Sequence, residues 1–403
     1  MSTKVILVLL DACRGDYINS DDTPFLARLS EEGRYYKYLV PSFGFCERTE
    51  ILVGTDALDS ECFTAFGYNP KLSPYQSFHY FFKLLGFVEE KINSAFFSKV
   101  IRRLIWEILR SKSGTFYPAR IPLGQLADFC LTEDGALNLI DNSDLSLYKV
   151  THSVYLKATT SLNQYLSGTD QSRLDDVVKA LDGPDSFYPT YVTELDAVGH
   201  VHGPGSSELK SSLKHVDSQL EIFQADIHAA GHNPVIVLCG DHGMSPVTSK
   251  VDIKSVFDRL KKEKYIGKGS TMFLDSTMAR FWFDGHKSNE VDLLREVIQD
   301  ECGEQGYFVN KNDYSDFGIP NLKMYGDLIW LCNEGVVISP DYFSPSNKVI
   351  LGMHGYRPMD KQHYGFCVVN GGGVERELFE GPAPLTAVYK ELHRHLANPK
   401  KEM

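Results

Sequence analysis

The 403-residue sequence lacks the marks of a secreted scaffold or a membrane protein. Its eight cysteines form no CxxC pair and are scattered along the chain, which is typical of reduced, buried thiols rather than of a disulfide framework. The apolar run near the N-terminus, Val5–Leu10, is too short for a signal sequence or a membrane span. We therefore expect a cytoplasmic protein without a transmembrane segment.

The sequence also lacks an excess of positive charge. Lys and Arg number 41 against 53 Asp and Glu, which gives a formal net charge of −12. Such an acidic chain is a poor candidate for binding a nucleic-acid polymer. A ligand that carries phosphate would need local positive charge, most simply from metal ions. With 43% hydrophobic and 23% charged residues, the composition is that of a globular protein.

Apolar strand-like runs alternate with helical segments along most of the chain. We predict strands over Lys4–Leu10, Tyr35–Val40, Phe187–Leu195 and Pro234–Cys239, and a long amphipathic helix over Ser206–Gly231. Continuous runs of Val, Ile and Leu are typical of strands buried on both faces of a parallel sheet. The alternation predicts an α/β fold with a doubly wound, mostly parallel sheet.

One region does not follow this alternation, and we predict that it is an inserted helical cap over residues 71–149. The catalytic α/β domain would then comprise residues 1–70 and 150–397. Within the insert, residues 81–113 carry seven Lys or Arg against three Glu, and apolar residues recur at helical spacing over 96–109. This pattern predicts either a cap helix packed on the core or a helix that makes peripheral contact with a membrane surface.

Acidic residues follow three of the predicted strands. Asp11, Asp196 and Asp241 are each expected at the carboxyl end of a strand. Ligands of open α/β sheets collect outside that edge. A single aspartate at such a place is commonly a helix cap, but three of them favour a shared binding site.

Histidines accompany these aspartates within glycine-rich segments. His200 follows Asp196 across a predicted glycine turn, His242 follows Asp241 between two glycines, and His354 lies in a Gly-Met-His-Gly segment. Carboxylate oxygens and imidazole nitrogens suit Zn²⁺ and also Mn²⁺. Six such ligands are enough for two divalent metal ions about 4 Å apart, an arrangement that serves displacement at phosphorus. Zinc and manganese are therefore the two candidate occupants.

Four segments in a fixed order carry a resemblance to a known family. They read LDACRGDY with its following P-F-L-x-x-L-x-x-x-G, then ELDAVGHVHGPGS, VLCGDHGM and MHGYRP. In this order they resemble the alkaline phosphatase superfamily, and within it the nucleotide pyrophosphatase/phosphodiesterase branch. The resemblance runs from residue 4 to about 370, with no match over 70–150. It implies an alkaline phosphatase-like fold.

The resemblance also implies how the site works. Attack on phosphorus would form a covalent phospho-enzyme, which metal-activated water would then hydrolyse. One metal would be held by Asp196, His200 and His354, and the second by Asp11, Asp241 and His242 together with the nucleophile.

The position of the nucleophile departs from the family pattern. The related branch places a Thr about ten residues before a glycine; Gly54 is the matching glycine here, and Gly44 stands ten residues earlier. We predict Cys46 as the nucleophile and as a metal contact, because a helix N-terminus and a metal would both favour its thiolate. Ser42 and Thr49 are the alternatives, as is a site without a side-chain nucleophile.

Three further features bear on the chemistry. The related sulfatases carry a C-x-P-x-R signature, which the segment Cys46-Glu-Arg-Thr-Glu lacks, so sulfate ester hydrolysis is not expected. Arg48 is a candidate catalytic residue that clamps phosphoryl oxygens, or else a surface cation beside Glu47 and Glu50. Asn69 is a candidate for substrate binding, although its Gly-Tyr-Asn-Pro context is also typical of a turn.

The sequence thus predicts a two-metal phosphodiesterase or pyrophosphatase. A phosphoryl-group transferase or phosphomonoesterase of the same superfamily is the first alternative, and a catalytically inactive binding protein on that fold is the second. The substrate would be a small-molecule phosphoester or one linked to a lipid or glycan, covered by an aromatic, basic lid formed by the insert. The sequence does not indicate the oligomeric state.

Overall fold

The computed structural model describes most of the chain. The described residues are 4–73, 75–92, 100–105, 120–132, 168–184, 186–283, 285, 288–344 and 349–396. Most of the apolar, basic stretch predicted over 96–109 therefore lies outside the described residues.

The chain divides into two compact units, which are described separately below. Residues 71–135 of the predicted insert belong to the second unit, together with a later segment that the sequence analysis assigned to the catalytic domain. The first unit comprises Met1–Ser60, Ala136–Val247 and Val349–Met403, and the second comprises Glu61–Gly135 and Thr248–Lys348.

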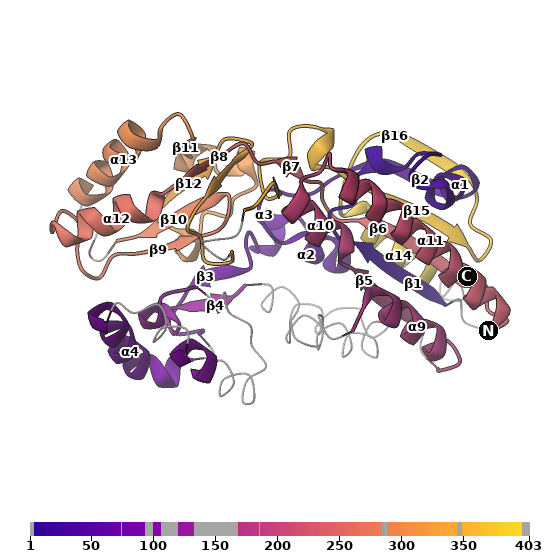
Figure 1. The fold of residues 1–403 in the computed structure, drawn as a ribbon, viewed down its shortest axis with the longest axis horizontal. Helices are drawn as coiled ribbons and strands as arrows, with labels where there is room; N and C mark the ends of the chain where they lie inside the picture. Colours follow the sequence, from indigo (N-terminus) through magenta and orange to yellow (C-terminus); the bar gives the residue numbers. More distant parts are fainter. Residues whose placement is uncertain are drawn as a thin grey trace. The chain divides into compact units, whose positions relative to one another are not determined.

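A six-stranded sheet forms the centre of the first unit (Figure 1). The strand order is β16-β2-β15-β6-β1-β5, and five strands run parallel while β15 runs the opposite way. The predicted α/β class with a mostly parallel sheet is confirmed. The strands are β1 Val5–Leu10, β2 Arg34–Val40, β5 Phe187–Val192, β6 Val235–Gly240, β15 Gly365–Gly371 and β16 Glu377–Pro384.

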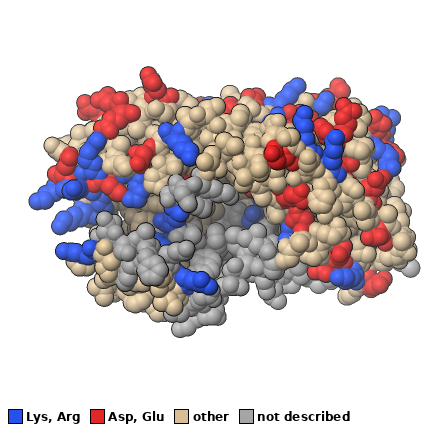
Figure 2. Space-filling model, viewed as in Figure 1, with Lys and Arg blue, Asp and Glu red and all other residues tan. Residues whose placement is uncertain are grey.

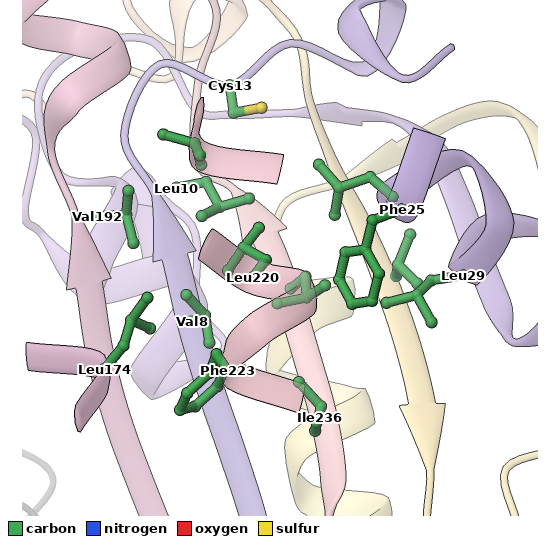
Figure 3. Packing of buried hydrophobic residues seen from close by; sticks show 14 of the residues in the cluster. Val8, Leu10, Cys13, Phe25, Leu29, Leu174, Val192, Leu220, Phe223 and Ile236 are labelled. Carbon is green, nitrogen blue, oxygen red and sulfur yellow. The ribbon is translucent and has the colours of Figure 1, made fainter. Parts of the chain in front are cut away.

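Helices cover both faces of this sheet, because alternate residues of a strand point to opposite faces. Val5 and Leu9 of β1 belong to one buried cluster with residues of α2 and α14, whereas Val8 and Leu10 belong to a second cluster with residues of α1, α9 and α11. Figure 3 shows this second cluster, with Phe223 of α11 packed near Val8. The helices are α1 Pro24–Glu32, α2 Glu47–Val53, α3 Ala57–Ser60, α9 Asp170–Ala180, α10 Glu194–His202, α11 Ser207–Ala229 and α14 Ala387–Leu396.

The second unit contains a four-stranded antiparallel sheet in the order β11-β12-β10-β9 and shorter two-stranded pairs. Arg280 of β10 is fully buried there and bonds to the Asp275 carboxylate at 3.0 Å and to the carbonyl of Phe66 at 2.7 Å. The elements are β3 Phe66–Tyr68, α4 His79–Ile92, β4 Phe129–Leu131, β8 Ser249–Val251, α12 Ile253–Lys262, β9 Thr271–Leu274, β10 Met278–Trp282, α13 Ser288–Cys302, β11 Gly306–Phe308, β12 Leu328–Cys332 and β13 Val336–Ile338.

The surface carries side chains of both charge signs. Figure 2 shows acidic and basic residues on the same face of the described part of the molecule. All eight cysteines are buried, and none takes part in a disulfide. Within the described ranges, the helices are all too short or too polar to cross a membrane.

Candidate metal centre

Two strand ends place the first pair of carboxylates. Strands β1 and β6 pair in parallel with Leu10 opposite Gly240, so the residues that follow, Asp11 and Asp241, emerge side by side. The Asp241 Oδ1 atom accepts a hydrogen bond from the backbone N–H of Ala12 at 3.2 Å. The sheet register therefore sets the positions of both carboxylates, as the sequence predicted.

His242 completes this set, which we call the strand-end group (Asp11, Asp241 and His242). Its Nδ1 atom lies 2.9 Å from the carbonyl oxygen of Gly243 and donates to it. Its Nε2 atom therefore faces the carboxylates, 3.3 Å from Asp11 Oδ1 and 3.8 Å from Asp241 Oδ1. One donor atom from each of the three residues lies within 4.8 Å of the others.

The glycines beside His242 act differently from the prediction. We expected them to allow a sharp turn, but neither Gly240 nor Gly243 has a positive φ. A Cβ at Gly243 would lie 1.9 Å from the carbonyl oxygen of Gln362. The absence of a side chain there permits close packing of two backbone segments.

The prediction that Asp196 ends a strand is wrong. Strand β5 ends at Val192, and Asp196 and His200 both lie on helix α10. Residues four apart share one face of a helix, so His200 Nε2 lies 3.1 Å from Asp196 Oδ1 without a glycine turn. Helix α10 begins almost directly after β5. Its start is stabilised by Asp170 Oδ2, which accepts hydrogen bonds from the backbone N–H groups of Thr193 and Glu194 at 3.1 and 3.0 Å.

Strand β14 (Gly352–Met353) brings His354 to this helix. The Leu351 N–H donates to the His200 carbonyl at 2.9 Å, and His200 Nδ1 donates to the carbonyl of Gly352 at 2.8 Å. A Cβ at Gly352 would lie 2.4 Å from the carbonyl oxygen of Gly199. A glycine is therefore needed for strand and helix to approach this closely.

We call Asp196, His200 and His354 the helix group. His354 Nε2 lies 3.7 Å from Asp196 Oδ1, and all three residues offer donor atoms within 4.8 Å of one another. The helix group adjoins the strand-end group, because the rings of His242 and His354 stack with centroids 4.0 Å apart and planes inclined by 12°. The structure thus brings together six of the seven residues predicted to contact metal; the seventh, Cys46, joins none of these groups.

The strand-end group is a coupled set of charges. Burial alone would raise the pKa of Asp11, but hydrogen bonds from His242 and Tyr191 and the charges of His242 and Arg48 hold it below its usual value. Burial raises the pKa of Asp241 to about 6. Although burial disfavours the imidazolium form, the Asp241 and Asp11 carboxylates raise the pKa of His242 well above its usual value. The position of His242 Nε2 therefore favours positive charge.

In the helix group, positive charge is favoured at His200 but not at His354. Burial opposes charge on His200, but the Asp196 carboxylate raises the pKa of this imidazole above its usual value. Burial and the nearby His242 and His200 hold the pKa of His354 well below its usual value, so its ring is neutral. The buried atoms Asp196 Oδ1 and His354 Nδ1 make no hydrogen bond.

These features fit a pair of divalent cations. A ligating histidine commonly donates its other ring nitrogen to a carbonyl or carboxylate, which orients the ligating nitrogen; His200 and His242 both do so. The aspartates add carboxylate oxygens to these nitrogens, and positive charge is favoured at the centre. Zinc and manganese both accept such a donor set.

Helix α2 carries the candidate nucleophiles. Cys46 is its N-cap and is 2% exposed, but among the described residues Cys46 belongs to none of the ligand groups. Thr49 is buried within the helix. The backbone N–H of Ser42 donates to Glu50 Oε2 at 2.7 Å. The choice among these three nucleophiles stays a prediction.

Sequence reasoning missed two residues of the centre. Glu47, directly after Cys46, forms a further ligand group with His242 and His354. Tyr191 of β5 donates a hydrogen bond from its hydroxyl to Asp11 Oδ2. The position of Glu47 at the predicted helix start was the available signal, whereas Tyr191 depends on the pairing of β1 with β5.

The remaining predicted residues lie in different places. The guanidinium of Arg48 lies 5.7 Å from the ring centroid of Tyr191, and its charge lowers the pKa of Asp11, so Arg48 lies near the strand-end group. Asn69 belongs to the second unit, where its Oδ1 accepts hydrogen bonds from the backbone N–H groups of Lys71 and Leu72 at 3.2 and 3.3 Å. A role for Asn69 in substrate binding stays a prediction.

An α/β sheet with paired Asp and His groups at one edge defines a class of candidate metallohydrolases. A family model described as Type I phosphodiesterase / nucleotide pyrophosphatase matches residues 139–357, more than half of the chain. The chain belongs to this enzyme family, which confirms the resemblance seen in the sequence.

Similar proteins agree with this assignment. A venom phosphodiesterase from Crotalus durissus collilineatus is 32% identical over 84 residues, a match that spans 19% of this chain and about a tenth of the relative's length. The structure of human ectonucleotide pyrophosphatase/phosphodiesterase 5 matches with a TM-score of 0.63 at 16% identity, covering 98% of this chain and 94% of that one. An inactive variant of the murine protein, in complex with AMP, matches with a TM-score of 0.61 at 15% identity, covering 98% and 95%.

Proposed function

We propose that the protein is a two-metal hydrolase of phosphodiesters or pyrophosphates. The observation that carries this proposal is the pair of adjacent ligand groups, joined by the stacked rings of His242 and His354 at 4.0 Å. Paired metal ions hold and polarise the phosphoryl group and lower the pKa of the attacking nucleophile. Zinc is the proposed occupant, with manganese as the alternative.

The chain's own residues have distinct tasks in this proposal. The strand-end and helix groups hold the cations in place, and Tyr191 orients Asp11 through its hydroxyl. Arg48 supplies a guanidinium near the strand-end group, where it would neutralise a phosphoryl oxygen. These tasks favour anionic phosphoesters over neutral esters.

A covalent phospho-enzyme is the proposed route, with Cys46 as the first candidate nucleophile. The family resemblance and the place of Cys46 at the N-cap of α2 support this choice. Attack by the thiolate would break the bond between phosphorus and the leaving oxygen. Water would then cleave the phosphorus–sulfur bond and restore the thiol.

A nucleotide is the proposed substrate class. The support is the family's own description and the AMP complex of the murine relative. A phosphoester linked to a lipid or glycan, and transfer of the phosphoryl group to an acceptor other than water, are the competing possibilities.

The test compares turnover of a bis-aryl phosphodiester, an aryl phosphomonoester and a dinucleotide pyrophosphate by the wild type, Cys46→Ala and Asp241→Asn. We expect the diester and pyrophosphate to be preferred over the monoester, and both variants to lose activity. Preference for the monoester would contradict the proposed substrate class. Activity retained in Cys46→Ala would overturn the thiol route, and a wild type that binds metal without any turnover would support an inactive binding protein.

We further propose peripheral contact of the second unit with an anionic membrane surface. Helix α4 exposes Tyr80, Leu84 and Phe87 (89%, 62% and 57%), and Lys91 lies in its last turn. Exposed apolar residues beside a lysine favour binding at an anionic lipid interface. Sedimentation with phosphatidylserine vesicles tests this, and equal binding by a Leu84→Ser/Phe87→Ser variant would contradict it.

A cytoplasmic location is also a proposal, supported by the eight buried thiols that are not joined in disulfides. Cell fractionation with an antibody to the protein tests it, and recovery from the medium would contradict it.

A further inference from the structure

Glu47 lies where the two ligand groups meet. It is the first residue of α2 and follows Cys46 directly. Its carboxylate, a nitrogen of His242 and a nitrogen of His354 lie within 4.8 Å of one another. Since His242 belongs to the strand-end group and His354 to the helix group, one carboxylate lies near a ligand of each.

We propose that Glu47 is a seventh ligand of the centre, whose carboxylate would help to hold the metal ions together with His242 and His354. This inference rests on the proposed two-metal function. A carboxylate can accept through both of its oxygens, and paired metals are typically about 3.5–4 Å apart. The rings of His242 and His354 stack with centroids 4.0 Å apart, so ligands of the two groups lie side by side near Glu47.

Charge balance favours the same role. The strand-end and helix groups together contain three aspartates, which leave two divalent cations with an excess positive charge. The Glu47 carboxylate supplies a fourth negative charge, so that the carboxylates alone offset the two cations, and buried charges are tolerated when they are paired or coordinate metals. Arg48 then remains as a positive charge next to the centre for an incoming phosphoryl group.

Unlike Glu47, Cys46 does not share a ligand group with the predicted metal ligands. Within the part of the chain that the structure describes, the Cys46 thiol joins none of the groups of His, Cys, Asp and Glu that could hold a metal.

The test measures metal binding rather than turnover. The wild type, Glu47→Gln, Cys46→Ala and a control, Glu31→Gln, are loaded with zinc in the presence of a competing chelator, and bound zinc is counted by native mass spectrometry. Glu31 is an exposed carboxylate on α1, so its variant matches the loss of one negative charge. Circular dichroism verifies that each variant is folded.

We expect Glu47→Gln to lower zinc affinity by at least about 10–100-fold, the loss seen when even a supporting residue of a metal ligand is removed, while Glu31→Gln binds as the wild type does. Two ions bound by Glu47→Gln with unchanged affinity would overturn the inference and leave the two-metal function intact. A wild type that binds no zinc or manganese would overturn the function as well.

Substitution with cobalt(II) gives an independent readout of the ligand atoms. A thiolate ligand produces a sulfur-to-cobalt charge-transfer absorption in the near ultraviolet, and a carboxylate does not. We expect no such band in the wild type. A band that is absent from Cys46→Ala would overturn the assignment in favour of the thiolate.

Discussion

The strand-end group and the helix group hold similar ligands in different ways. The strand-end group is placed by the register of two central strands, and its side chains are 4–15% exposed. The helix group is built from an i, i+4 pair and a short docked strand, and its side chains are 20–24% exposed. The same chemistry can thus rest on a rigid sheet edge or on a helix and a loop, and the second arrangement exposes its ligands more.

The largest expected effect comes from removing one ligand of either group. Asp241→Asn and Asp196→Asn should each reduce phosphodiester turnover by more than about 100-fold, because loss of a direct ligand exceeds the 10–100-fold loss for a supporting residue. Each variant should lose zinc mainly from its own group. Steady-state kinetics and zinc content measure this.

The matched control is Asp226→Asn, an exposed aspartate on α11. Equal activity of Asp241→Asn, Asp196→Asn and this control would mean that the two groups are not a metal centre.

A smaller effect is expected from Tyr191→Phe, which removes the hydroxyl that donates to Asp11. Loss of such a supporting hydrogen bond should lower metal affinity or turnover by about 10–100-fold. Tyr188→Phe on the same strand is the control, because its hydroxyl accepts from the Lys4 ammonium at 3.0 Å instead. If both variants lose activity equally, the effect is one of strand stability and not of ligand orientation.

The contact between β14 and α10 positions only the helix group, so a change at this contact tests that group separately from the strand-end group. Gly352→Ala places a methyl 2.4 Å from the Gly199 carbonyl oxygen, and overpacking of this kind costs about 1–3 kcal/mol. We expect a lower free energy of unfolding in urea and weaker zinc binding by the helix group, with little change in the strand-end group. Gly205→Ala, where an added Cβ meets nothing within 4 Å, should leave both unchanged.

The smallest expected effect is kinetic. A chelator should remove one zinc ion faster than the other, because the helix group is the more exposed. Stopped-flow transfer of zinc to a coloured chelator should show two phases, and His200→Gln should abolish the faster one. Loss of the slower phase in that variant would reverse the assignment.

Much of the strand-end group could be predicted from the sequence. The apolar runs that end before Asp11 and Asp241 are buried strands, and parallel pairing brings their ends together. The alternation of strands and helices likewise predicted the α/β class.

The residues of the helix group could be recognised from the sequence, but the secondary structure that holds Asp196 was predicted wrongly. The predicted strand runs past Val192 to Leu195, through the polar residues Thr193 and Glu194. The start of α10 depends on Asp170, which lies 23 residues before Thr193. A cap supplied from another helix leaves no local signal at the helix it caps. The place of Glu47 between the groups likewise depends on where α2 packs, which residue spacing does not determine.

The proposed two-metal centre is tested most directly by the number of metal ions that the wild type binds. Native mass spectrometry after dialysis against zinc or manganese measures this number, with turnover of a bis-aryl phosphodiester followed in parallel. We predict two ions per chain, and activity that a chelator abolishes and added metal restores. A wild type that binds no metal at saturating concentrations, or whose turnover is unchanged by the chelator, would contradict the account.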